Sequence, residues 1–202
     1  MAGKYAVSAG LLIAALLGGL GYFILSDRGD ARFAHCRETA IAGAIGGPFE
    51  LIDHTGRTVT DGDLIDRPTL IYFGYTFCPD VCPWDAARNA RAVDLLAEQG
   101  KAAQPVFISV DPERDTPEVL ARFAGNLHPE MIALTGSLEQ VRAASQAYRT
   151  FFQRHEGDEF YLVDHSTFSY LALPGHGVVE VFRRTQHAED IAEAMACFIA
   201  AA

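Results

Sequence analysis

The feature that most constrains the fold is a short apolar run that leads directly into two cysteines. Residues 68–73 read Pro-Thr-Leu-Ile-Tyr-Phe, and Cys78 and Cys82 follow closely. The run is β-branched and aromatic without polar alternation, which is typical of a strand buried on both faces of a sheet. Residues 83–99 then place apolar side chains at roughly helical spacing and end at Gly100. We therefore expect both thiols at a junction between a buried strand and a helix.

This junction has chemical consequences for the thiols. The start of a helix offers unpaired N–H groups and the positive end of the helix dipole, and both favour a thiolate over a thiol. Pro83 disfavours the α conformation at Cys82 and itself fits a first helical turn, so residues 78–82 are predicted to form a loop that caps the helix. Two thiols this close can hold one soft metal ion or close a disulfide, and the local sequence leaves both open.

The N-terminal part of the 202-residue chain reads differently from the rest. Residues 5–25 contain no charge, and a helix of that length spans a bilayer core of about 30 Å. The run exceeds a signal-peptide core of about 7 to 15 residues and ends in no small-x-small site, which favours an uncleaved anchor over a cleaved leader. We predict a tail over 1–4, a transmembrane anchor over 5–25, a linker over 26–46 and a globular domain over 47–202. Basic residues lie on both sides of the anchor, so charge alone does not orient it.

The charge of the chain limits its partners. The formal net charge is −10, whereas nucleic-acid binding needs a basic surface to meet phosphates. No nucleic acid is expected as a partner.

Strands and helices alternate through the domain. Predicted strands at 104–111 and 131–135 alternate with helices at 117–127 and 137–152, and a hairpin over 168–182 precedes a terminal helix over 187–201. Residues 111–117 form a polar loop that caps a helix, or that presents its acidic groups to a partner or near the cysteine loop. The alternation predicts an α/β fold of thioredoxin-like plan, with a central mixed sheet flanked by helices.

Three separated motifs carry a more specific resemblance. They read Phe-Gly-Tyr-Thr-Phe-Cys-Pro-Asp-Val-Cys-Pro at 73–83, Ser-Val-Asp-Pro-Glu-Arg-Asp-Thr-Pro at 109–117 and Asp-His-Ser-Thr-Phe at 164–168. In this order they resemble the Sco/SenC family of copper-binding assembly factors for cytochrome c oxidase. The resemblance extends from about residue 47 to residue 200. It implies a single-pass anchor in the inner, cytoplasmic membrane with the domain in the periplasm.

The resemblance also implies a copper site formed by Cys78, Cys82 and His165. Two thiolates and an imidazole suit Cu(I), and copper heads the affinity order of divalent first-row ions, so Cu(I), Cu(II) or both are expected. Zinc is the main rival, but a structural zinc site closes with four ligands and only three are found here. Asp164 is either a hydrogen-bond partner of His165 or of a motif amide, or a solvated carboxylate.

The function implied is that of a copper chaperone. Such a protein receives copper from a donor chaperone and delivers it to the binuclear copper centre of cytochrome c oxidase subunit II or a related acceptor. As a metallochaperone the chain is not expected to be an enzyme. The alternative is a thiol-disulfide reductase that uses Cys78 and Cys82 to reduce the cysteines of the acceptor. The two roles are compatible, because copper binding requires the dithiol.

Two further cysteines lie outside the motifs. Cys36 falls in the predicted linker and Cys197 in the last predicted helix. In an oxidising compartment they can form a bridge that staples the N-terminal segment to the domain. The sequence leaves open whether they do.

Overall fold

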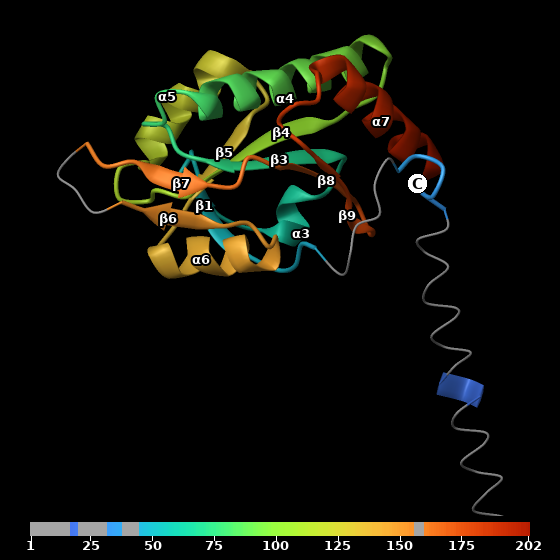
Figure 1. The fold of residues 1–202 in the computed structure, drawn as a ribbon, viewed down its shortest axis with the longest axis horizontal. Coiled ribbons are helices and arrows are strands. Elements are labelled where there is room, and N and C mark those ends of the chain that lie inside the picture. The colour runs from blue at the N-terminus through green and yellow to red at the C-terminus, as the bar shows by residue number, and fades with distance from the viewer. Residues whose placement is uncertain (1–16, 20–31, 38–44, 156–159) are drawn as a thin grey trace, which may run out of the picture.

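A seven-stranded sheet forms the centre of the structure, a computed structural model that describes residues 17–19, 32–37, 45–155 and 160–202 (Figure 1). The strands run in the order β2-β1-β5-β4-β3-β8-β9. Strands β3, β4 and β5 are parallel, and the other neighbours pair antiparallel. Their bounds are β1 (Glu50–Asp53), β2 (Thr58–Thr60), β3 (Thr69–Gly74), β4 (Gln104–Ser109), β5 (Ile132–Thr135), β8 (Ser169–Leu173) and β9 (Gly177–Phe182). The predicted mixed sheet is confirmed.

Helices cover both faces of this sheet. They are α3 (Asp61–Leu64), α4 (Val81–Glu98), α5 (Pro117–Leu127), α6 (Leu138–Ala147) and α7 (Ala188–Ala201). In Figure 1, α4, α5 and α7 lie above the sheet, and α3 and α6 lie below it. The crossovers from β3 to β4 and from β4 to β5 move in the same direction across the sheet, and α4 and α5 lie on one face, as right-handed crossovers require. Strands β3 and β4 are consequently buried along their whole length, as an apolar run without alternation predicts.

Helix α4 begins earlier than the sequence predicted. Its first residue is Val81, so Cys82 lies inside the first helical turn and not in a preceding loop. Pro83 is tolerated there because the N–H groups of a first turn have no partner within the helix. The cysteine pair therefore spans the junction itself, with Cys78 in the loop and Cys82 on the helix.

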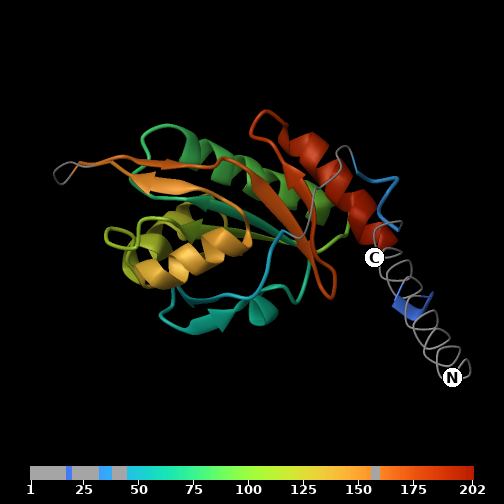
Figure 2. The same ribbon diagram turned by 60° about the horizontal axis from the view of Figure 1, so that its bottom comes forward.

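The helix predicted to run to residue 152 ends five residues earlier. Helix α6 ends at Ala147, Arg149 adopts a φ of 50°, and the Thr150 N–H donates to the Ser145 carbonyl at 3.0 Å. A left-handed residue with such a closing bond is a common helix terminator. Strand β6 (Phe152–Arg154) follows and pairs antiparallel with β7 (Val163–His165) in a separate two-stranded sheet. Figures 1 and 2 show this pair on the side of the domain away from α7.

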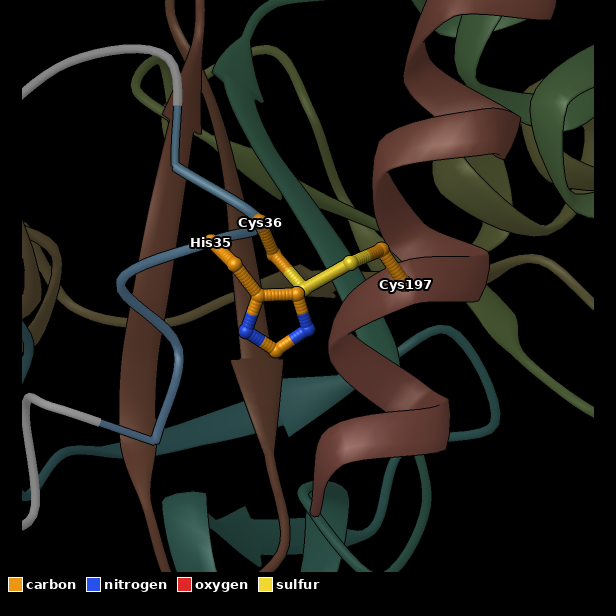
Figure 3. Close-up of side chains that lie close together, drawn as sticks. All are labelled: His35, Cys36 and Cys197. Carbon is orange, nitrogen blue, oxygen red and sulfur yellow. A yellow bond between two sulfur atoms is a disulfide. The ribbon is translucent and has the colours of Figure 1, made fainter.

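Part of the predicted linker packs on the domain. Phe33 is buried with its ring centroid 5.5 Å from that of Phe198, and an Arg32 guanidinium nitrogen donates to the Ala202 carbonyl at 3.0 Å. Cys36 is joined to Cys197 by a disulfide, with Cα atoms 5.7 Å apart (Figure 3). The bridge that the sequence allowed is thus present, and it fixes residues 32–37 against α7.

The predicted tail, and the predicted anchor over 5–25 apart from residues 17–19, lie outside the described residues. Within the described ranges, no helix is long and apolar enough to cross a membrane.

Candidate metal centre

Three elements bring Cys78, Cys82 and His165 together. Cys78 lies in the loop after β3, Cys82 in the first turn of α4, and His165 at the end of β7. The Sγ atom of Cys82 is 3.0 Å from Nε2 of His165, and the ligand atoms of all three residues lie within 4.8 Å of one another. Residues far apart in the sequence thus converge on one point at the carboxyl end of β3.

His165 is held in the form that can bind a metal. Its Nδ1–H donates to the Ser166 carbonyl at 2.9 Å, so the neutral ring presents the Nε2 lone pair to Cys82. The rings of Tyr72 and Tyr75 pack edge-on against it, with centroids 6.1 and 5.7 Å away. Burial lowers the pKa of His165, although the Ser166 hydrogen bond and the charge of Asp85 oppose the shift. The imidazole is therefore neutral at neutral pH.

The two thiols differ in acidity. Burial raises the pKa of Cys78, but hydrogen bonds from the Cys82 side chain and from neighbouring backbone amides outweigh it, and the net pKa is lowered. One of these is the Cys82 N–H, which lies 3.4 Å from the Cys78 sulfur. Burial and the hydrogen bond to Cys78 raise the pKa of Cys82 above its ordinary value, so the expectation that the helix start favours a thiolate is wrong for this cysteine. Cys78 is therefore the first thiolate, and a bound cation is what would favour the second.

Gly74 makes room for the Cys82 sulfur, and the sequence analysis did not identify it. A Cβ at Gly74 would lie 3.1 Å from Cys82 Sγ, 3.0 Å from the Phe107 ring and 2.9 Å from the Tyr72 ring. Any larger residue would push one of these groups away. A glycine that ends a buried strand is a signal of close approach, and this signal could have been used.

The cysteine loop is anchored by a buried carboxylate from the polar loop over 111–117. The backbone N–H and hydroxyl of Thr76 donate to Asp115 at 3.0 and 2.5 Å, and the Ser109 hydroxyl donates at 2.6 Å. Thr116 meanwhile caps α5 by accepting from the Val119 N–H. The loop therefore caps a helix, and one of its acidic groups also anchors the cysteine loop.

Asp164 does not support His165. Its carboxylate is exposed and pairs with His155 Nε2 at 2.8 Å. Successive residues of a strand point to opposite faces, so Asp164 points away from the cysteines when His165 points toward them. The Ser166 carbonyl takes the role that the sequence analysis considered for Asp164.

A second group also consists of one histidine and two cysteines, but its cysteines are joined in a disulfide. His35, Cys36 and Cys197 also place their ligand atoms within 4.8 Å of one another. Figure 3 shows His35 beside the sulfur–sulfur bond. Disulfide sulfurs carry no thiolate, so this group lacks the metal-binding form of its cysteines. Among the described residues, only Cys78 and Cys82 are free cysteines.

The fold and the site together define a thioredoxin-like protein with two free thiols and a histidine at a strand-to-helix junction. Comparison with known proteins gives the family. The SCO1/SenC family model matches residues 37–200. The chain belongs to the SCO1/SenC family.

Relatives and solved structures agree with this assignment. Protein SenC of Rhodobacter capsulatus is 54% identical over 171 residues, which cover 83% of this chain and 77% of that protein. The mitochondrial SCO1 homolog 1 of Arabidopsis thaliana is 40% identical over 152 residues, 74% of this chain but 46% of its own length. Among solved structures, Arabidopsis ScoI with copper bound matches with a TM-score of 0.74 and 38% identity, covering 78% of this chain and 99% of that one. Yeast Sco1 with copper bound matches with a TM-score of 0.73 and 33% identity, and the match covers 78% of this chain and 90% of that one.

Proposed function

We propose that the chain is a copper chaperone that holds one copper ion through Cys78, Cys82 and His165 and delivers it to the binuclear copper centre of cytochrome c oxidase subunit II. The observation that carries the proposal is the preassembled ligand set, in which the sulfur of Cys82 lies 3.0 Å from Nε2 of a neutral His165 and near a second free thiol. Soft thiolates with an imidazole select copper. The copper-bound structures of two relatives support the same cargo.

The number of ligands supports a carrier over a permanent metal site. Three ligands leave a position at which a ligand of the acceptor can bind before one of the donor's ligands leaves, whereas a structural site closes with four. His165 comes from the small β6–β7 sheet, not from the central sheet that precedes both cysteines. One ligand therefore belongs to a separate structural unit from the other two, an arrangement that suits release.

The proposed setting is the periplasmic side of the inner membrane. We assign residues 5–25 as a single-pass anchor because they are uncharged and long enough to span a bilayer. The Cys36–Cys197 disulfide is consistent with an oxidising compartment. A donor chaperone would supply the copper. Protease added outside spheroplasts tests the orientation: it should digest the domain of the full-length chain, and a protected domain would contradict the assignment.

Copper retention tests the ligand set. The full-length chain with reduced Cys78 and Cys82 is expected to retain one copper after passage through a desalting column, and His165→Ala should lose most of it. His155→Ala is a matched control, because His155 is an exposed histidine beside the same two-stranded sheet and should leave retention unchanged. Equal retention by the parent and His165→Ala would show that His165 is not a ligand.

The unequal acidity of the two thiols favours a second candidate function, thiol-disulfide reduction. The Cys78 thiolate would attack a disulfide of the acceptor to form a mixed disulfide, and Cys82 would then displace the acceptor sulfur. The products are a Cys78–Cys82 disulfide and an acceptor dithiol, so two electrons pass to the acceptor. His165→Ala separates the functions, because it should retain this reduction while losing copper.

A further inference from the structure

Exposed aromatic side chains come from the same three segments as the buried ligands. Phe77 immediately precedes Cys78, Trp84 shares the first turn of α4 with Cys82, and Phe168 follows His165 closely. These aromatic residues, which we call the aromatic rim, are 54%, 74% and 42% exposed, whereas Cys78 and Cys82 are buried. Large aromatic side chains exposed together mark interaction surfaces, because leaving them in water is unfavourable.

A cation–π contact holds one member of the rim, Phe77. The Arg114 guanidinium lies 4.8 Å from the centroid of the Phe77 ring and is itself held by Asp111 and the Tyr161 carbonyl. Trp84 and Arg88 are one helical turn apart on α4 and so share a face. Phe77 is thus held by a fixed guanidinium and Trp84 projects from a regular helix, which reduces the ordering cost of binding.

Arginines extend this surface beyond Trp84. Arg88 donates to the Ser169 hydroxyl at 2.9 Å, next to Phe168, and to the carbonyls of Arg183 and Arg184 at 3.3 and 2.8 Å. Arg183 and Arg184 are exposed, although the chain as a whole carries a net charge of −10, and Arg184 Nε also lies 4.0 Å from a carboxylate oxygen of the buried Asp85. A partner with carboxylates at this position would complement the local charge.

We infer that the aromatic rim, flanked by Arg183 and Arg184, is the docking surface for the copper acceptor. The acceptor would present apolar side chains around its own copper ligands and carboxylates opposite the two arginines. This inference rests on the proposed function. Because Cys78 and Cys82 are buried, an acceptor ligand reaches copper only if the surface around them is in contact with the partner. The apolar contact also excludes water during ligand exchange.

Transfer kinetics test the surface separately from copper binding. The copper-loaded full-length chain in detergent is mixed with the purified copper-binding domain of oxidase subunit II, and the copper content of each protein is measured over time. Trp84→Ser and Phe168→Ser should each slow transfer about tenfold or more, as loss of an interface anchor does. Leu138→Ser is the matched control, because Leu138 is 39% exposed and lies on α6. All three variants should still retain one copper.

The charge of the surface has its own test. Transfer by the parent should slow as salt rises, and Arg184→Glu should slow transfer severalfold at low salt and reduce the salt dependence. Arg67→Glu is the control: its side chain is 49% exposed, against 47% for Arg184, and it precedes the opposite end of β3.

The outcomes distinguish the inference from the proposed function. If the aromatic rim variants retain copper and transfer it as fast as Leu138→Ser, the docking surface is wrong and delivery stands. If they lose copper, the rim belongs to the metal site and the docking assignment is overturned. A parent chain that retains copper but transfers none overturns delivery, and the docking inference with it.

Discussion

Two clusters in this molecule each contain one histidine and two cysteines, but the chain holds them differently. The first is Cys78, Cys82 and His165, and the second is His35, Cys36 and Cys197. In the first, the two cysteines are neighbours at one helix start, and the Cys82 amide donates to Cys78 while His165 meets the Cys82 sulfur. In the second, two cysteines 161 residues apart are bonded to each other.

This difference assigns different roles to chemically similar groups. A disulfide across so long a loop restricts the unfolded chain and contributes about 5 kcal/mol in the chain-entropy model. A disulfide between Cys78 and Cys82 would close only a very short loop, so in that model it would stabilise the folded state much less. Its free thiols, with pKa values shifted in opposite directions, are instead arranged for chemistry. Sequence separation and hydrogen-bond partners, not composition, determine what such a cluster does.

The largest expected effect is the loss of a thiol from the first cluster. Cys82→Ser should weaken copper affinity more than about 100-fold. Replacing a residue that only hydrogen-bonds to a metal ligand already lowers metal affinity about 10- to 100-fold. The midpoint of thermal unfolding of the copper-free protein should change little. Competition with a copper chelator measures the affinity. Retention equal to that of the parent would place the copper elsewhere.

The opposite pattern is expected for the second cluster. Cys36→Ser should lower the free energy of unfolding by about 2–5 kcal/mol, as removal of a native disulfide does, and leave copper retention unchanged. Urea unfolding of the copper-free protein measures the first quantity. Loss of copper in this variant would show that the two clusters are not independent.

A smaller effect should follow from crowding the first cluster without removing a ligand. Gly74→Ala introduces a methyl group 3.1 Å from the Cys82 sulfur, so we expect copper affinity to fall about tenfold and stability by about 1–3 kcal/mol. Gly125→Ala is the control. Gly125 lies within α5, and apart from its chain neighbours and the nearby helix backbone no atom lies within 4 Å of its added Cβ, so its replacement should stabilise the helix by about 0.5–1 kcal/mol. If Gly74→Ala behaves like this control, the close approach has no functional importance.

The smallest effect concerns pH. Burial lowers the pKa of His165, so the unfolded chain binds a proton more readily than the folded chain once the pH falls below the ordinary value of 6.5. The free energy of unfolding should therefore decrease as the pH falls through 6.5, by at most about 1.4 kcal/mol per pH unit for this one group. His165→Gln should remove this component, which denaturant titrations at several pH values would detect. The disulfide has no titrating thiol, so its contribution should be the same at each pH.

The sequence was most informative where local chemistry and local structure coincide. The buried β3 run, the helix cap from residues 111–117 and the cysteine junction could all be predicted, because each depends on residues close together in the chain. His165 was predicted through the resemblance, and the structure places it beside Cys82.

What could not be predicted depends on tertiary context. Strand β6 continues directly from the turn after α6, and only its pairing with β7 distinguishes it from a helix end. The choice between Asp164 and the Ser166 carbonyl depends on which face of β7 points to the cysteines. The role of Asp115 depends on its hydrogen bonds to Thr76, which is 39 residues away in the chain, so the local sequence does not distinguish it from its acidic neighbours.

X-ray absorption at the copper edge of the loaded full-length chain tests the central claim most directly. We predict one copper with two sulfur neighbours and one nitrogen neighbour, and a nitrogen signal that disappears in His165→Ala. A first shell without nitrogen, or one that His165→Ala leaves unchanged, would contradict the assignment of Cys78, Cys82 and His165 as the copper site.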